Sequence, residues 1–228
     1  MLINSEKLAS LGRLVSEIAH EVNNPLMIIS GNAQLSLMEK SLSEELNNNL
    51  KIIVQECQRA KDVIRRVLRF ARSNKGEVKE VDINQSIEMV VGLLEKQFML
   101  TNNVEIKRQY MEKGLYINID EQQIQEMFMN LLNNAKEAMP RGGVITITTS
   151  LENKMLRIDL KDTGEGMSEE TMGKIMEPFF TTKETGTGIG LAVCYGIVKA
   201  HGGDLRFESE LGKGTAATIW LPLGERNG

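Results

Sequence analysis

The first third of the chain has a helical pattern of apolar positions. From Leu8 onward, apolar side chains recur at spacings of three and four residues, as they do on one face of an α-helix. This first series shifts its phase after Pro25, and a second series then keeps a heptad spacing through Leu46, Leu50, Ile53, Cys57, Ala60, Ile64, Val67 and Ala71. Between the two series, Ser43 is placed to cap the second helix. The pattern predicts an antiparallel helical hairpin over residues 1–71. Because two helices cannot bury both sides of such a seam, we expect two chains to form a dimeric four-helix bundle.

Beyond the hairpin, the pattern changes to mixed helix and strand. Residues 72–81 are polar and charged, and we interpret them as a linker. Helical periodicity follows over 84–100, 120–139 and 189–200, and strand patterns over 104–109, 115–119, 144–150, 155–161, 205–208 and 216–221. Because amphipathic helices and strands each have one face to bury, residues 82–228 are predicted to form a two-layer α/β sandwich.

Composition and charge exclude several classes of protein. The 228 residues carry 27 basic and 31 acidic side chains, a net charge of −4 that argues against nucleic acid as a partner. No apolar run approaches the ~18 residues that a membrane span needs. The two cysteines, Cys57 and Cys194, are too few for a disulfide framework and wrongly spaced for zinc. A reducing, cytoplasmic location is the simplest interpretation.

His20 is the first candidate for chemistry. Counted in heptads, it lies at the position that points away from the helix partner. Asn24 lies one turn later on the same face, and Glu21 lies on its flank. An exposed histidine on a polar face would explain His20 alone, but a carboxylate that takes a ring proton leaves the other nitrogen free to attack phosphorus. His201 ends a helix before a glycine, where a cation favoured by the helix C-terminus suffices as an explanation.

Two motifs in the second part suit metal and nucleotide chemistry. Asn130 and Asn134 share one helix face and offer amide oxygens to a metal ion. Asp162 ends a predicted strand and precedes Gly164 and Gly166. Such a motif can be an ordinary turn. It can equally be a carboxylate that receives an exocyclic amine, with glycines that let a flat ring approach the backbone.

A glycine-rich segment, residues 186–191, opens the last predicted helix. Its bare N–H groups and the positive end of the helix dipole suit an anion. The spacing matches neither the Rossmann nor the Walker pattern. The loop before it carries Phe179, Phe180 and Lys183, and we expect one ring to pack while the other positions the loop.

In this order, the motifs resemble the catalytic core of bacterial sensor histidine kinases, in the variant of nitrogen-regulator and sporulation-type kinases. The matching segments are the histidine box (20–25), the asparagine box (130–135), the glycine boxes (162–166, 186–190 and 212–215) and the phenylalanine box (178–183). The resemblance covers nearly the whole chain, from about Leu8 to Leu223. It implies a HisKA-type dimerisation and phosphotransfer hairpin followed by an ATP-binding domain of the Bergerat fold.

The resemblance also implies roles for individual residues. His20 would accept the γ-phosphoryl group with Glu21 as its base, and Asn24 would orient a water that hydrolyses a phosphorylated regulator. Asp162 would receive the adenine amine, and Asn134 with Asn130 would hold Mg²⁺. The implied ATP-binding residues are Asn130, Asn134, Asp162, Gly164, Gly166, Phe180, Thr181, Thr182, Lys183, Gly186, Thr187, Gly188, Ile189, Gly190, Leu191 and Thr215. Glu137 stands where many relatives carry a basic residue that meets a phosphate, which shifts that contact onto Lys183.

The implied activity is that of an ATP-dependent histidine autokinase, a homodimer that passes its phosphoryl group to an aspartate of a response-regulator receiver domain. One rival is an ATPase that drives clamp or chaperone motion, and the exposed His20 on a heptad hairpin speaks against it. A degenerate scaffold is the other rival, and the complete set of motifs speaks against that. We expect no direct membrane contact of this segment, although a sensor domain outside it could be membrane-bound.

Overall fold

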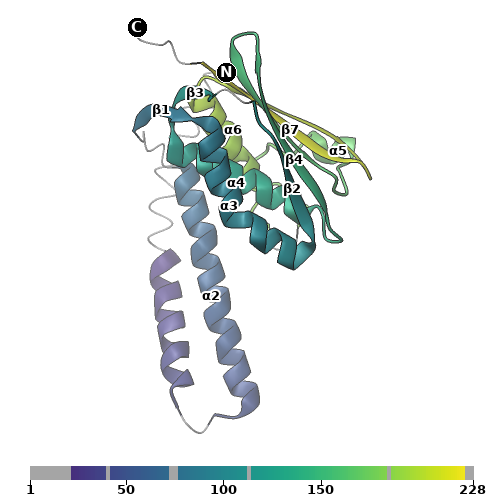
Figure 1. Cartoon of the computed structure of the whole chain (residues 1–228). Coiled ribbons are helices and arrows are strands. Elements are labelled where there is room, and N and C mark those ends of the chain that lie inside the picture. Colours follow the sequence, from purple (N-terminus) through teal and green to yellow (C-terminus); the bar gives the residue numbers. More distant parts are fainter. Residues whose placement is uncertain (1–21, 40–41, 72–76, 112–113, 184–185, 224–228) are drawn as a thin grey trace. The chain divides into compact units, whose positions relative to one another are not determined.

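The computed structural model describes residues 22–39, 42–71, 77–111, 114–183 and 186–223. The chain divides into two units, Met1–Asn74 and Lys75–Gly228 (Figure 1). None of the helices in these described ranges is long and apolar enough to cross a membrane.

The first unit is a helical hairpin. A helix over residues 22–37 is followed by α2 (Glu44–Ala71), and a short connection joins them (Figure 1). The N–H of Leu46 donates to Ser43 Oγ at 3.2 Å, which confirms Ser43 as the cap of α2. The predicted pair of helices is therefore present.

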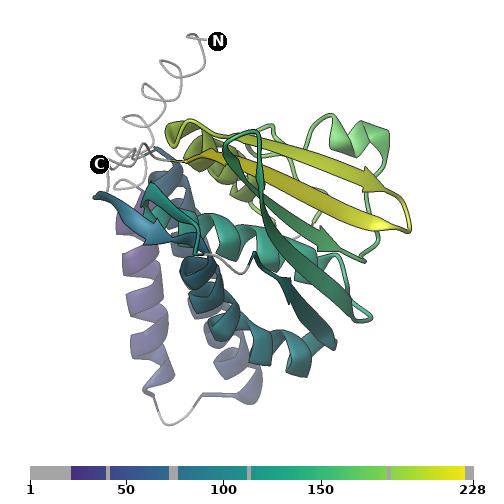
Figure 2. The same ribbon diagram turned by 45° about the horizontal axis from the view of Figure 1, so that its top comes forward.

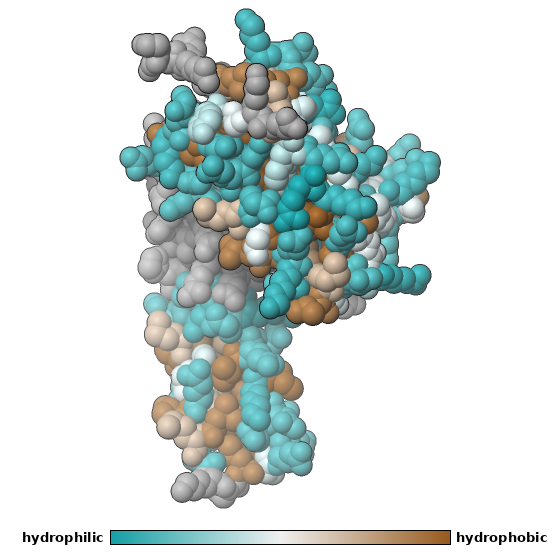
Figure 3. All heavy atoms as spheres, viewed as in Figure 1, coloured by the Kyte–Doolittle hydropathy of each residue, from teal (hydrophilic) through white to brown (hydrophobic). Residues whose placement is uncertain are grey.

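The hairpin leaves much of its apolar surface exposed in the single chain. Ala33 and Cys57 are buried. The exposed large apolar side chains of the hairpin are Val22, Met27, Ile28, Ile29, Leu35, Met38, Leu46, Ile52 and Ile53. Figure 3 shows hydrophobic surface along the hairpin. Leu46 and Ile53 belong to the predicted heptad seam, so part of that seam has no cover within the described part of one chain.

The second unit has two layers. Its sheet has the order β2-β4-β5-β7-β6, in which β2 runs parallel to β4 and the other neighbours are antiparallel. The strands are β2 (Val104–Gln109), β4 (Gly143–Glu152), β5 (Met155–Asp162), β6 (Asp204–Glu210) and β7 (Gly214–Pro222). The helices α3 (Ile83–Asn102), α4 (Glu121–Glu137) and α6 (Gly190–Ala200) cover one face (Figure 2). Apolar side chains of the helices and of alternate strand positions form the core between the layers, which confirms the predicted sandwich.

One strand lies inside the predicted linker. Residues 72–81 were expected to be a linker, but β1 (Val78–Asp82) pairs antiparallel with β3 (Tyr116–Asp120). Val81 is its buried apolar side chain, and the three residues before it are exposed. Because apolar and polar residues hardly alternate in this segment, its own sequence does not predict a strand. The strand depends instead on pairing with β3, which is distant in sequence. A second unpredicted element is the single turn α5 (Glu169–Met172).

The helix starts differ in a way that matters for the site. At α4, the N–H groups of Gln122 and Gln123 donate to Asp120 Oδ1 at 3.1 and 3.2 Å, so Asp120 caps this helix. By contrast, α6 begins after Ile189 without any side-chain cap, and its first turn contains no acidic residue. The N–H groups at this end of α6 are therefore available to an anion.

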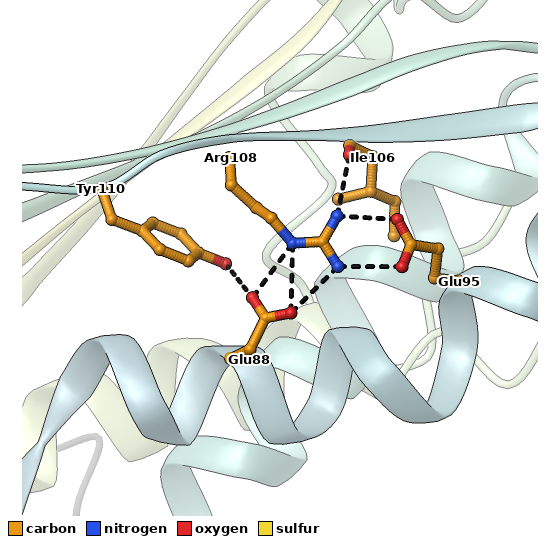
Figure 4. Close-up of polar contacts among 5 residues, drawn as sticks. All are labelled: Glu88, Glu95, Ile106, Arg108 and Tyr110. Atoms are coloured by element: carbon orange, nitrogen blue, oxygen red, sulfur yellow. Dashed lines mark hydrogen bonds and ion pairs between the residues drawn. The ribbon is translucent and has the colours of Figure 1, made fainter.

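Arg108 of the edge strand β2 forms ion pairs with two glutamates of α3 (Figure 4). Arg108 donates to Glu88 at 3.0–3.1 Å, to Glu95 at 2.7 and 2.9 Å, and to the Ile106 carbonyl at 3.2 Å. The Tyr110 hydroxyl donates to Glu88 at 3.2 Å. The hydrogen bonds from this guanidinium hold the pKa of the Glu95 carboxyl below its usual value.

Candidate functional site

Two asparagines of α4 lie against the first residue of α6. Asn130 and Asn134 are half-buried. A Cβ added at Gly190 would lie 3.8 Å from Asn130 Oδ1 and 4.0 Å from Asn134 Nδ2. Asn133, between them, instead donates to the carbonyl of Met129 at 2.8 Å. The structure therefore brings the two predicted amides together with the uncapped start of α6.

Lys183 reaches the same face of α4. Its Nζ donates to Asn134 Oδ1 at 3.3 Å and also to the carboxylate of Glu137. The backbone N–H of Lys183 donates to Thr181 Oγ1 at 3.1 Å, while Thr182 is exposed. Sequence reasoning missed the contact with Glu137, although the spacing from Asn134 places both on one helix face.

The glycine-rich segment joins the preceding loop through backbone contacts. The N–H of Phe179 donates to the Gly188 carbonyl at 3.0 Å, and a Cβ at Gly188 (φ +66°) would collide with Phe179. Phe179 is exposed and Phe180 is half-buried, and neither is part of the hydrophobic core cluster. The expectation that a ring packs is thus met only by partial burial of Phe180. A Cβ at Gly186 would also collide, in this case with Thr181 Oγ1.

Ile189 and Leu191 anchor the start of α6. Ile189 is buried, and Leu191 packs against the core. Thr187 is half-buried. The side chains of Ile189 and Leu191 therefore position the segment.

Asp162 ends β5 and is 4% exposed. Its Oδ1 accepts hydrogen bonds from the N–H groups of Gly164 at 2.8 Å and Thr215 at 3.1 Å. Its Oδ2 has no hydrogen-bond partner among the residues that the structure describes. Burial raises the pKa of the Asp162 carboxyl, and the two N–H bonds oppose that shift. The result is a positioned acceptor of the kind that an exocyclic amine requires.

The two glycines after Asp162 lie close to the protein's own backbone. A Cβ at Gly164 would lie 2.7 Å from the Ala138 carbonyl oxygen at the end of α4. At Gly166 (φ +67°), a Cβ would collide with the carbonyl of Glu210 at the end of β6. Close approach of the protein's own backbone is therefore sufficient reason for glycine at both positions.

Both ring nitrogens of His201 lie within hydrogen-bond distance of backbone groups at two helix ends. The N–H of Asp120 donates to His201 Nε2 at 3.0 Å, and Nδ1 lies 2.8 Å from the Ile197 carbonyl. Because Nε2 accepts, the proton must be on Nδ1, where it can be donated to Ile197. The ring thus connects the C-terminus of α6 with the N-terminus of α4.

The histidine motif, residues 20–25, lies only partly within the described residues. His20 and Glu21 lie outside the described residues, and their roles stay predictions. Asn24 is exposed in the helix over residues 22–37.

Comparison with known proteins decides the family. A family model described as "Histidine kinase-, DNA gyrase B-, and HSP90-like ATPase" matches residues 119–225, and one for the "His Kinase A (phospho-acceptor) domain" matches residues 10–76. The solved catalytic domain of histidine kinase ThkA is 31% identical, with a TM-score of 0.59, over 64% of this chain and 95% of that domain. The chain belongs to the histidine kinase family.

The two-part organisation of this histidine kinase is shared with longer relatives. Sporulation kinase C of Bacillus subtilis (strain 168) is 38% identical over 96% of this chain and 50% of its own length. ThkA in complex with the response regulator protein TrrA is 27% identical, with a TM-score of 0.70, over 98% of this chain and 65% of that one. The chain thus spans between a quarter and about half of the length of the curated relatives it matches. The family resemblance and the hairpin-plus-sandwich fold are confirmed.

Proposed function

We propose that this chain is an ATP-dependent histidine autokinase that phosphorylates His20 and relays the phosphoryl group to an aspartate of a response regulator. The observation that carries the proposal is the meeting of Asn130 and Asn134 with the uncapped start of α6. Amide oxygens for a cation and bare N–H groups for an anion then lie side by side, which suits a nucleotide triphosphate that carries a metal ion.

The nucleotide would lie between two ends of this site. Asp162 Oδ2 accepts a hydrogen bond from the adenine amine, since its other oxygen is already occupied. The start of α6 and the ammonium of Lys183 bind phosphate oxygens. The backbone around Gly164, Gly188 and Thr215 shapes the walls.

Mg²⁺ fits the same residues. Asn130 and Asn134 offer oxygen donors, and the hydrogen bond from the Lys183 ammonium to Asn134 Oδ1 supports this oxygen as a ligand for a cation. No group of three or more His, Cys, Asp or Glu side chains among the described residues could hold a metal. Mg²⁺ with few protein ligands takes its others from phosphate and water, so it would arrive with ATP and neutralise phosphate charge.

The phosphoacceptor would be the neutral imidazole of His20. Glu21 would take the proton from one ring nitrogen, and the lone pair of the other would attack the γ-phosphorus while its bond to the bridging oxygen breaks and ADP leaves. Catalysis of such a transfer is mainly positioning and neutralisation of oxygen charge. Asn24, exposed one turn from His20, would orient a water when a phosphorylated regulator docks.

Three further points belong to the proposal. The exposed apolar side chains of the hairpin favour a homodimer that closes a four-helix bundle. The complex of ThkA with a response regulator supports a receiver domain as the partner. The free thiols of Cys57 and Cys194 suit the reducing, ATP-containing cytoplasm.

The test is incorporation of γ-labelled phosphate. The chain incubated with labelled ATP and Mg²⁺ should acquire label that is labile in acid and stable in base. His20→Gln should abolish that label while ATP binding, measured by calorimetry, stays intact. Native labelling of a folded His20→Gln variant would overturn the assignment.

A further inference from the structure

Glu137 places a negative charge at the end of the site where phosphate is expected. It lies three residues after Asn134 on α4, and its carboxylate is ion-paired with Lys183 Nζ. The same ammonium donates to Asn134 Oδ1 at 3.3 Å. One cation thus connects a carboxylate and a candidate metal-binding amide.

The helix α4 itself supplies no cationic side chain for a phosphate on this face. Lys136 is the one basic residue in its sequence, and its Nζ lies 5.9 Å from the centre of the Phe98 ring on α3. Between residues 178 and 191, Lys183 is likewise the one basic residue. Any side-chain ammonium supplied by these two segments to the phosphates must therefore come from Lys183.

The pairing leaves Lys183 competent to bind an anion. An ammonium has three N–H donors, and two are directed to Glu137 and Asn134. The Lys183 side chain is 40% exposed, so a ligand can reach it. A free lysine loses rotamer entropy when it binds phosphate. Lys183 has lost part of that entropy already, because Glu137 holds it.

We propose that Glu137 is a positioning residue, which holds the ammonium of Lys183 on the Asn134 face of α4 and so prepares it for the nucleotide phosphates. The inference rests on the proposed function, since it concerns the phosphate end of the ATP site. It explains how an acidic residue can favour binding of a polyanion: its own charge is neutralised by the cation that it holds.

A double-mutant cycle tests this role. Calorimetry on the full chain should show that Glu137→Gln weakens MgATP binding about three- to fivefold, the range of a partly exposed ion pair. Adenosine binding should not change, and Glu137→Asp should restore part of the MgATP affinity. Lys183→Met should weaken MgATP binding about tenfold or more. Adding Glu137→Gln to Lys183→Met should cause no further loss.

A matched control is available on α5. Glu170→Gln removes an exposed glutamate that pairs with Lys174 at 2.9 Å, and it should leave MgATP binding unchanged.

Three results would overturn the positioning role. Unchanged MgATP affinity in Glu137→Gln would show that the ion pair does not prepare Lys183. Tighter binding would show that the carboxylate repels the phosphates. A loss that persists in the Lys183→Met background, with a changed Mg²⁺ requirement, would make Glu137 a metal ligand. Failure of the proposed function looks different, because the unaltered chain would then bind neither MgATP nor adenosine.

Discussion

Replacing Asp162 with Asn should weaken ATP binding and leave the fold intact, because the two carboxylate oxygens have different partners. Oδ1 accepts from the N–H groups of Gly164 and Thr215, at 2.8 and 3.1 Å. An asparagine has one acceptor oxygen, and these two donors will keep it in the Oδ1 position. The NH₂ group must then replace Oδ2 and present a donor to the adenine amine, which is also a donor.

The magnitude follows from the bonds involved. Turning the amide over would break the two hydrogen bonds from the backbone N–H groups, at about 0.5–1.5 kcal/mol each. It would also place the NH₂ group against these two donors. In the favoured orientation, the complex loses a hydrogen bond to a charged acceptor, worth about 1.5–3 kcal/mol. That corresponds to about a ten- to hundredfold rise in Kd. Burial raises the pKa of Asp162, so its ionised form opposes folding at neutral pH, and the substitution should not lower the free energy of unfolding appreciably.

Calorimetry with ATP, adenosine and inorganic triphosphate measures the effect. Adenosine and ATP should lose the same factor in affinity, while triphosphate binding stays unchanged. Asp159→Asn is the control, since it removes another carboxylate from β5, one that accepts from Arg157 and Thr218. An unchanged Kd for ATP in a folded Asp162→Asn variant would refute the assignment of this residue to adenine.

Other predictions test the fold and the metal site. Arg108→Met leaves two carboxylates without their cation and should lower the free energy of unfolding in urea by about 1–2 kcal/mol; a change below ~0.3 kcal/mol would contradict this. Because Arg108 lowers the pKa of Glu95, stability that is present above the unfolded pKa of ~4.3 should be lost as pH falls through the lower, folded pKa. Acid titration of unfolding should show a smaller loss in Arg108→Met. Asn134→Ala should remove the Mg²⁺-dependent part of ATP affinity and leave the oligomeric state unchanged by light scattering. In the same assay, a 75–228 fragment should be monomeric and a 1–74 fragment dimeric, and the reverse would refute the hairpin as the dimer interface.

Local features were predictable because nearby residues determine them. The cap of α2 at Ser43 depends on a few consecutive residues, and the structure has it. The strands expected over 144–150 and 155–161 follow from the apolar alternation that one buried sheet face imposes, and β4 and β5 contain them. The family resemblance rests on motifs of the same local kind.

Contacts between segments that are distant in sequence could be identified only from the tertiary structure. The hydrogen bond from Asp120 to His201 spans 81 residues, and it gives His201 a partner at the start of α4. The ion pair of Lys183 with Glu137 spans 46 residues. The residues around His201 and Lys183 do not predict these partners, because either side chain could equally well face solvent.

By itself, the sequence determined a heptad hairpin, an α/β sandwich and the residue types of a nucleotide site, since periodicity and short motifs reflect interactions within one or two turns of chain. Only the tertiary structure decided that Val78–Asp82 form a strand, since that strand depends on pairing with β3. It also decided that backbone approach accounts for Gly164, because the helix end it meets is 26 residues earlier in the chain, at Ala138. Which groups share a site depends on how separate elements pack, and no single segment encodes that packing.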